Sequence, residues 1–244
     1  MISISFLPCN NGLGHIRRMA LIANKIPKHD KNIFFIIDKT KKEKFNLNNN
    51  IKKNYFKNNS SNQLNKLFKN KLLKNSNVIF SDNLLHKKFI FKKTILFANF
   101  FWEEILNKNK ENLKILKSKN IKIFSNYLFS NIKTKIIVKK VGFFEKYKPS
   151  KKNDSILIST GTANSRLFKK FKKQIIKIVK NKSFGKKKLY LDPSLYKKNF
   201  KRYSVFKASY SKKMYSQITF AMIKPGLGTI EECLKRGIPI IPIM

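Results

Sequence analysis

The chain has 244 residues, of which 42% are apolar, and this is enough for a packed core in one large or two modest domains. The formal net charge is +43, from 55 Lys and Arg against 12 Asp and Glu, which would attract nucleic acid, an anionic membrane or a phosphorylated substrate. The composition excludes a largely disordered chain. The excess charge is mostly lysine spread along the sequence with abundant Asn, Ile and Phe, a set with AT-rich codons, so biased genome composition is an alternative explanation for it.

Cysteine and histidine are too sparse for a disulfide framework or a zinc site. Cys9 and Cys233 lie far apart, and the three histidines are scattered. The amino terminus lacks the basic start of a signal peptide, and no apolar run approaches the ~20 residues that span a bilayer. We therefore expect no metal, no cofactor and a cytoplasmic location, where basic and apolar residues of the first domain could touch the anionic inner face of the membrane.

The first half of the chain predicts a parallel α/β domain. Residues 2–7 predict a short buried strand, the NNGLGH segment a turn, and residues 32–38 a second strand. The helix between them has four small or apolar residues on one face: Ile16, Met19, Ala20 and Ala23. Residues 39–77 predict one or two helices, and further strands are expected at 78–83, 94–98, 122–126 and 135–144, the second of these running into a helix. This order is that of a βαβ unit continued into a sheet.

The pattern restarts after a polar, proline-containing linker at residues 148–154. Strands are expected at 155–160, 188–192, 204–208, 219–223 and 239–244, and helices at 167–179, 212–217 and 229–236. Both halves begin with a strand, a glycine-containing loop and a helix, the arrangement of doubly wound domains. The expected domains are therefore residues 1–147 and 155–244. The second is expected to be incomplete, since a full domain would need further βα units of about 30 residues each.

The most informative segment is IKPGLGTIEECLKRGIPIIPI, residues 223–243. Glycines after a strand let a ligand approach the backbone, and the free N–H groups of the following helix start suit a phosphate. Thr229 can add a hydroxyl donor, and Glu232 can accept hydrogen bonds from ribose hydroxyls. The alternative is structural: Thr229 and Glu232 also have the spacing of a capping box, with Thr229 as N-cap.

The loop after the first strand, CNNGLGHIRR, places His15 at a helix start. The helix dipole there favours a neutral imidazole, which can take a proton from an acceptor hydroxyl. Arg17 and Arg18 oppose the dipole in the first turn, which indicates an anionic partner. A purely structural histidine and a chance excess of basic residues are the alternatives.

Two further loops follow predicted strands. In the turn at residues 159–165, Gly161 and Thr162 could contact a diphosphate, although an ordinary strand–helix turn explains them equally. In the first half, Asn99 and Trp102 could line an acceptor pocket. A carboxylate base could come from Asp82, Glu103 or Glu104, and the aromatic residues beside them could equally be core.

The PGLGTIEECLKRGIP segment resembles the donor-site motif of family 28 glycosyltransferases. Its matching positions are Gly226, Leu227, Gly228, Thr229 and Glu232, and the motif ends at Gly237 and Pro239. The loop with Gly12, Gly14, His15 and Arg18 is similar to the amino-terminal loop of GT-B transferases related to that family. It is also similar to nucleotide-sugar hydrolases of the pseudaminic acid pathway, so it does not separate transfer to an acceptor from transfer to water.

The resemblance implies a GT-B fold of two Rossmann-like domains with a nucleotide-sugar in the cleft between them. It implies a metal-independent, inverting hexosyl transfer from a UDP-sugar to a glycan or lipid-linked acceptor, of the lipid-linked N-acetylglucosamine transferase type, in cell-envelope glycan synthesis. The donor would contact Gly161, Thr162, Gly226, Leu227, Gly228, Thr229 and Glu232. His15 would be the catalytic base, and the cleft loops would contribute Asn11, Gly12, Gly14, Arg18 and Asn99.

The sequence departs from the glycosyltransferase family in one respect, and two other functions are alternatives to the transferase prediction. The acidic–amide pair that usually follows the last strand in GT-B transferases has no counterpart here, which leaves activity open. A nucleotide-sugar hydrolase or epimerase of the same fold is the first alternative. A non-enzymatic binder of polyanions is the second, but no stacking-aromatic motif of an RNA-binding module is present, so nucleic acid is not expected as a partner.

Overall fold

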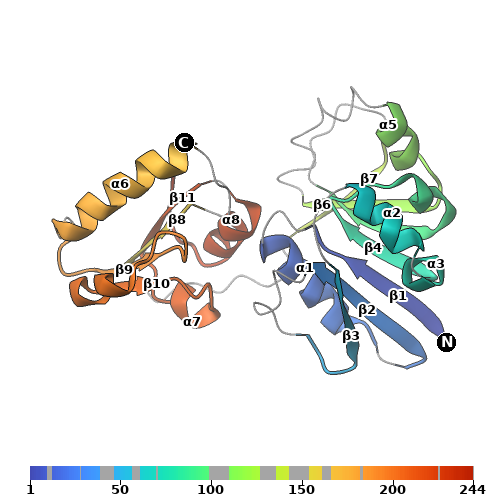
Figure 1. Cartoon of the computed structure of the whole chain (residues 1–244), viewed down its shortest axis with the longest axis horizontal. Coiled ribbons are helices and arrows are strands. Elements are labelled where there is room, and N and C mark those ends of the chain that lie inside the picture. The colour runs from blue at the N-terminus through green and yellow to red at the C-terminus, as the bar shows by residue number, and fades with distance from the viewer. Residues whose placement is uncertain are drawn as a thin grey trace. The chain divides into compact units, whose positions relative to one another are not determined.

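The computed structural model divides the chain into two compact units, Met1–Phe144 and Glu145–Met244, each described by itself (Figure 1). The predicted linker lies outside the described residues, apart from Asp154. The structure describes residues 1–9, 13–27, 29–38, 47–56, 61–69, 71–98, 110–126, 136–142, 154–160, 166–181, 184–224 and 226–243.

The first unit is built on a parallel sheet with strand order β3-β2-β1-β4-β5-β6-β7. Its strands are β1 (Ile2–Leu7), β2 (Lys31–Asp38), β3 (Ile51–Phe56), β4 (Val78–Asp82), β5 (Lys93–Phe97), β6 (Ile121–Asn126) and β7 (Val138–Val141). In the register, Ile4 of β1 lies between Ile33 of β2 and Val78 of β4. The order of the strands therefore reverses between β1 and β4, and this switch point is where doubly wound folds bind ligands.

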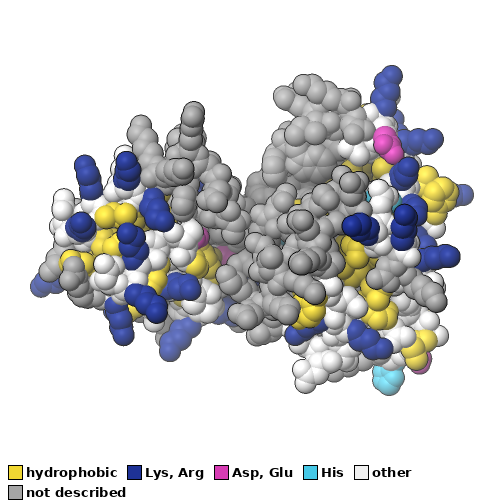
Figure 2. Space-filling model, in the orientation of Figure 1, with side chains coloured by type: hydrophobic (Ala, Val, Ile, Leu, Met, Phe, Trp, Pro, Cys, Tyr) yellow, Lys and Arg dark blue, Asp and Glu magenta, His cyan; other side chains and the backbone are white. Residues whose placement is uncertain are grey.

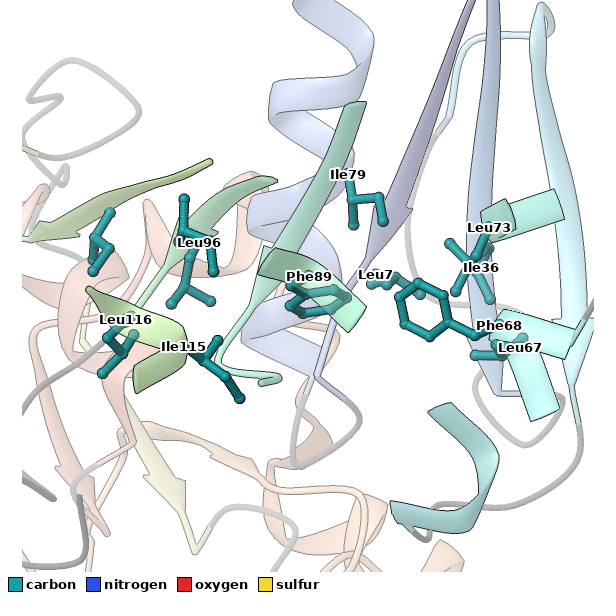
Figure 3. Packing of buried hydrophobic residues seen from close by; sticks show 13 residues of the cluster. Leu7, Ile36, Leu67, Phe68, Leu73, Ile79, Phe89, Leu96, Ile115 and Leu116 are labelled. Carbon is teal, nitrogen blue, oxygen red and sulfur yellow. The ribbon is translucent and has the colours of Figure 1, made fainter. Parts of the chain in front are cut away.

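Helices cover both faces of this sheet. One face packs on α1 (Leu13–Lys25), whose buried residues are the four predicted to share a face: Ile16, Met19, Ala20 and Ala23. The other face packs on α2 (Ser61–Lys69), α3 (Lys71–Lys74), the 3-10 helix η2 (Lys87–Phe91) and α5 (Lys110–Leu116). Figure 3 shows this second layer, in which Phe68, Phe89 and Leu116 meet Leu7, Ile79 and Leu96 of the strands.

Two elements of the first unit differ from the expectation. Residues 39–77 were expected to hold only helices, yet residues 51–56 form β3; α2 and α3 confirm the helical part. The strand was missed because β3 is an edge strand whose Lys52 and Lys53 are exposed, so it lacks a buried strand's apolar run. Helix α5 was not anticipated either, and the helix expected after Ala98 lies outside the described residues.

The second unit repeats the plan with strand order β10-β9-β8-β11-β12, all parallel. Its strands are β8 (Ser155–Ser159), β9 (Lys188–Leu191), β10 (Val205–Lys207), β11 (Phe220–Ile223) and β12 (Ile240–Pro242). One face packs on α6 (Arg166–Lys180) and η4 (Lys198–Tyr203), and the other on α7 (Lys212–Tyr215) and α8 (Leu227–Leu234). Ile156 and Ile158 face the first layer and Leu157 the second, as strand alternation requires.

Lysine and arginine side chains are spread over the visible surface of both units and do not gather over one element (Figure 2). Basic residues outnumber acidic residues in each unit. Among the described residues, no helix is both long enough and apolar enough to cross a bilayer.

Candidate functional site

Three polar side chains meet at the carboxyl end of β1 and β4 in the first unit. Helix α1 begins at Leu13, so His15 lies in its first turn, and Asp82 is the last residue of β4. His15 Nδ1 is 2.9 Å from Asp82 Oδ1. Arg18 Nε donates to Asp82 Oδ2 at 2.9 Å, and its Nη2 contacts both carboxylate oxygens at 2.6 and 2.7 Å. The switch point of the first sheet thus carries a His–Asp–Arg cluster.

Burial and charge together fix the ionisation of Asp82, whose side chain is fully buried. Burial alone would raise its pKa, but the charge of Arg18 and the hydrogen bond and charge of His15 outweigh this and lower the pKa below its usual value. The carboxylate is therefore an acceptor only, and we assign the proton of a neutral His15 to Nδ1. Nε2 is then the basic nitrogen, on a side chain that is 19% exposed.

The predicted residues of this loop fall into two groups. Gly14, His15 and Arg18 are in α1. Arg18 pairs with Asp82 of the same unit, and this pair accounts for a positive charge near the start of the helix without an external anion. Asn11, Gly12 and Asn99 lie outside the described residues, as do Trp102, Glu103 and Glu104. Sequence reasoning offered Asp82 as one of three acids, and the pairing of β1 with β4 is the signal that selects it.

In the second unit, helix α8 begins at Leu227, two residues before the predicted start at Thr229. Gly226 is the N-cap residue and has no side chain with which to cap the helix; the N–H groups of Thr229 and Ile230 bond to the Gly226 carbonyl at 2.9 Å each. Thr229 is thus inside the first turn, which contradicts the capping-box alternative. The first N–H groups of a helix have no intrahelical acceptor, so this start can accept an anion.

Gly226 has no structural reason to be glycine. Its φ of −122° and ψ of 122° are ordinary extended values, and among the described residues an added Cβ would meet only the Lys224 carbonyl oxygen, at 3.7 Å. Gly237 differs, because its φ is +61° and it ends the helix, with the Ile238 N–H bonded to the Cys233 carbonyl at 3.0 Å. Gly237 therefore serves the fold, whereas an absent side chain at Gly226 leaves room at the helix start.

Thr160 adds a second feature at the switch point of the second sheet, between β8 and β11. It follows β8, the neighbour of β11, and the Lys224 N–H beside it donates to the Ser159 carbonyl at 2.8 Å. The Thr160 side chain is 5% exposed, and its hydroxyl has no hydrogen-bond partner in the described part of the chain. A buried hydroxyl without a partner is costly, which points to a ligand that completes it. The predicted contacts Gly161 and Thr162 lie outside the described residues.

Glu232 lies in the second turn of α8 with its side chain 26% exposed. Its carboxylate pairs with Lys235 Nζ at 3.1 Å and with Arg236 Nη1 at 2.5 Å, and so it is directed along the helix instead of back to the N-cap. Within the described ranges, no group of three His, Cys, Asp or Glu residues could hold a metal ion.

A buried hydrogen-bond network, which sequence reasoning missed, fixes the rest of this sheet edge. Asp192, directly after β9, accepts from Tyr210 Oη at 2.5 Å and Ser159 Oγ at 3.3 Å through Oδ2, and from the Ser194 hydroxyl at 2.6 Å through Oδ1. Burial, then the charge of Asp192, raise the pKa of Tyr210, so its hydroxyl remains a donor. The network ties the ends of β8 and β9 to the loop after β10.

No protein-family model matches the chain, and no curated protein matches it in sequence. Solved structures are similar. Arabidopsis thaliana UGT89C1 complexed with UDP matches with a TM-score of 0.64 at 10% identity, over 99% of this chain and 79% of that chain. LpCGTa in complex with UDP matches with 0.59 at 11%, over 100% and 79%, and the spinosyn rhamnosyltransferase SpnG with 0.59 at 9%, over 99% and 80%. The predicted fold class is thereby confirmed: the chain has the GT-B fold, with two Rossmann-like domains.

Proposed function

We propose that the protein is a glycosyltransferase whose second unit binds a nucleotide-sugar and whose first unit supplies the base. Two features of the second unit carry this proposal: the start of α8, whose N-cap residue has no side chain, and the Thr160 hydroxyl, which has no hydrogen-bond partner within the described residues. A diphosphate could accept hydrogen bonds from both. The resemblance of residues 223–243 to a donor-site motif supports it, and the UDP complexes of structures with this fold suggest the nucleotide.

On the donor side, the N–H groups at Leu227 and Gly228 and the hydroxyls of Thr160 and Thr229 would hold the diphosphate, together with Gly161 and Thr162. Glu232 would accept hydrogen bonds from the ribose hydroxyls. The positive end of the helix dipole stabilises the departing nucleoside diphosphate without a metal ion. This assigns stabilisation of the leaving group to α8.

On the acceptor side, His15 Nε2 would take the proton of an acceptor hydroxyl as its oxygen attacks the anomeric carbon. The C–O bond to the diphosphate breaks as the new one forms, so the configuration inverts. Asp82 stabilises the resulting imidazolium and holds the ring through Nδ1. Arg18 keeps Asp82 ionised, which makes it a positioning residue in this scheme.

The finer assignments rest on the family resemblance. We propose a UDP-hexose donor and a glycan or lipid-linked acceptor, as in the N-acetylglucosamine transferases of cell-envelope synthesis. The cleft loop would include Asn11, Gly12, Gly14 and Asn99. The basic surface supports a cytoplasmic enzyme that contacts anionic lipid peripherally.

A nucleotide-sugar hydrolase is the second candidate, because His15, whose side chain is 19% exposed, could equally activate water. Release of free sugar from the donor without acceptor would identify it.

A thermal-shift panel tests the proposed donor site. It contains UDP, UDP-sugars, other nucleotide-sugars and a random oligonucleotide, and compares wild type with Glu232→Ala. A ligand at ~100 times its Kd should stabilise the wild type by about 2.7 kcal/mol. We expect a UDP compound to raise the melting temperature and Glu232→Ala to remove most of the rise.

Glu231→Ala is the matched control, since Glu231 precedes Glu232 and pairs with the same Lys235 at 3.6 Å. It should keep the response to UDP. A panel in which only the oligonucleotide stabilises the protein, and salt abolishes the effect, would overturn the transferase proposal in favour of polyanion binding.

A further inference from the structure

The cations that hold Glu232 are unusually buried for their type. The Arg236 side chain is 7% exposed and the Lys235 side chain is 4% exposed. Lysine and arginine are almost never buried to this degree unless they are paired. The contacts that these two residues make therefore call for an explanation.

The Arg236 guanidinium contacts one aromatic ring and two oxygen atoms of Glu232. Its guanidinium lies over the ring of Tyr215, with Cζ 5.2 Å from the ring centroid, and Tyr215 is itself 1% exposed. Its Nη1 donates both to the Glu232 carbonyl oxygen at 3.1 Å and to Glu232 Oε2. A guanidinium that lies over a ring and is bonded at one edge has little freedom, so its partner carboxylate is also held in one place.

Stability alone is a weak reason for this arrangement. A buried ion pair contributes little net stability compared with apolar residues of similar volume, because both charges lose their hydration. The two pairs occupy one acceptor position on each Glu232 oxygen, with Lys235 donating to Oε1 and Arg236 donating to Oε2. A carboxylate has about four acceptor positions, so others remain for a ligand on a side chain that is 26% exposed.

We propose that Arg236 positions Glu232 to receive the ribose hydroxyls of a nucleoside diphosphate and offsets its charge beside the diphosphate, with Lys235 as its helper. This inference rests on the proposed function. An unpaired carboxylate one turn beyond the anion-binding helix start would repel a diphosphate, whereas a neutralised, fixed one accepts hydroxyls without that repulsion. Arg236 is thus a positioning residue that acts through Glu232.

The test compares the affinity for UDP with that for 2′,3′-dideoxy-UDP, which lacks both ribose hydroxyls, by isothermal titration at one salt concentration. The wild type should prefer UDP by at least about tenfold, the value of one hydrogen bond to a charged group. Arg236→Gln should reduce the preference to less than about threefold. Arg236→Lys, which keeps the charge but not the fork, should give an intermediate preference.

Two further variants distinguish a loss of Glu232 positioning from a general loss of folding or of positive charge. Lys187→Gln, which breaks an exposed pair with Asp154 in the same unit, should keep the wild-type preference. The double variant Glu232→Gln/Arg236→Gln removes both charges of the pair, and its preference should equal that of Glu232→Gln alone.

The outcomes distinguish the two proposals. Failure of the wild type to bind UDP overturns the proposed function. If the wild type binds UDP, but Arg236→Gln and Arg236→Lys both keep the wild-type preference for UDP over the dideoxy analogue, only the role of Arg236 is overturned. That role is also overturned if the effects of Glu232→Gln and Arg236→Gln on this preference add in the double variant.

Discussion

Asp82 carries its charge inside the first unit because two donors share it. Arg18 bonds to both carboxylate oxygens, and His15 approaches one of them. A buried carboxylate without such partners would take up a proton and lose its hold on the imidazole. The single arginine one turn after His15 therefore preserves both the charge of Asp82 and the orientation of the histidine.

Asp82→Asn should destabilise the protein and abolish sugar transfer. Removing one partner from a buried ion pair costs about 3–5 kcal/mol, because Arg18 is left without its carboxylate. The amide also no longer stabilises an imidazolium. Urea unfolding monitored by circular dichroism and a turnover assay measure the two effects.

Asp154→Asn is the matched control, since this carboxylate is 82% exposed in its pair with Lys187. It should change stability by less than about 1 kcal/mol. Equal effects of the two variants would contradict a structural role for the Asp82 cluster.

The two ends of helix α8 use glycine for different reasons, and Gly226→Ser separates them. Serine is a preferred N-cap residue and fits the extended backbone at Gly226, so helix stability should hold or rise by a few tenths of a kcal/mol, about 0.3. The new hydroxyl would occupy the N–H groups assigned to the diphosphate, so affinity for UDP should fall by at least about tenfold. Thermal unfolding and titration with UDP check both.

Gly237→Ser is the counterpart at the other end. Its positive φ disfavours any residue with a Cβ, so it should cost about 1 kcal/mol while UDP affinity stays within about twofold. Weak UDP binding in this variant, or intact binding in Gly226→Ser, would argue against ligand contact at Gly226.

The short helix η2 depends on a neutral histidine. His86 is its N-cap residue; Nδ1 accepts from the Lys88 N–H at 3.2 Å, Nε2 is 3.0 Å from Asn65 Oδ1, and the ring stacks on Phe68. Burial first, and then the charges of Lys88 and Lys87, lower the pKa of His86 below its usual 6.5. Protonation would replace the acceptor that caps η2 with a donor.

Stability should therefore fall as the solution is acidified. The folded state resists protonation while the unfolded chain takes up a proton near pH 6.5, so the contribution of His86 is complete above that pH and is lost as the pH falls through it. Urea midpoints at pH 7.5 and about 5.5 measure the loss. His86→Asn, which keeps a cap acceptor that does not titrate, should flatten this dependence, and His29→Asn at an exposed position should not.

Sequence reasoning reached most elements of the fold. Buried strands such as β1 and β8 are dense apolar runs, and the buried residues of α1 recur at helical spacing. The buried positions of these elements can therefore be predicted from residue type and spacing. The edge strand β3 shows no such run, because among the described residues it pairs with β2 alone and its Lys52 and Lys53 are exposed. The start of α8 was predicted two residues too late because Thr229 is a residue type common at N-caps. The actual N-cap residue, Gly226, has no side chain that would indicate a helix start.

The candidate sites were only partly predictable. Glycines and a histidine after strands mark a ligand loop, since strand ends meet at one sheet edge. The partners of those residues are long-range: His15 meets Asp82 across 67 positions, and Tyr210 meets Asp192 across 18. Only the strand order brings them together. Arg236 is close to Glu232 in sequence, but its burial under Tyr215 depends on tertiary packing.

At the scale of the molecule, the first strand of each sheet lies between two strands that come later in the chain. β1 lies between β2 and β4, and β8 between β9 and β11. Followed from the amino terminus, every later strand in the described part of the chain joins an open edge, and none has to insert between two that came before. A ribosome releases about 5–20 residues per second. Each sheet can therefore grow outward in the order in which its strands are made, and the first unit can finish while the second is still being translated.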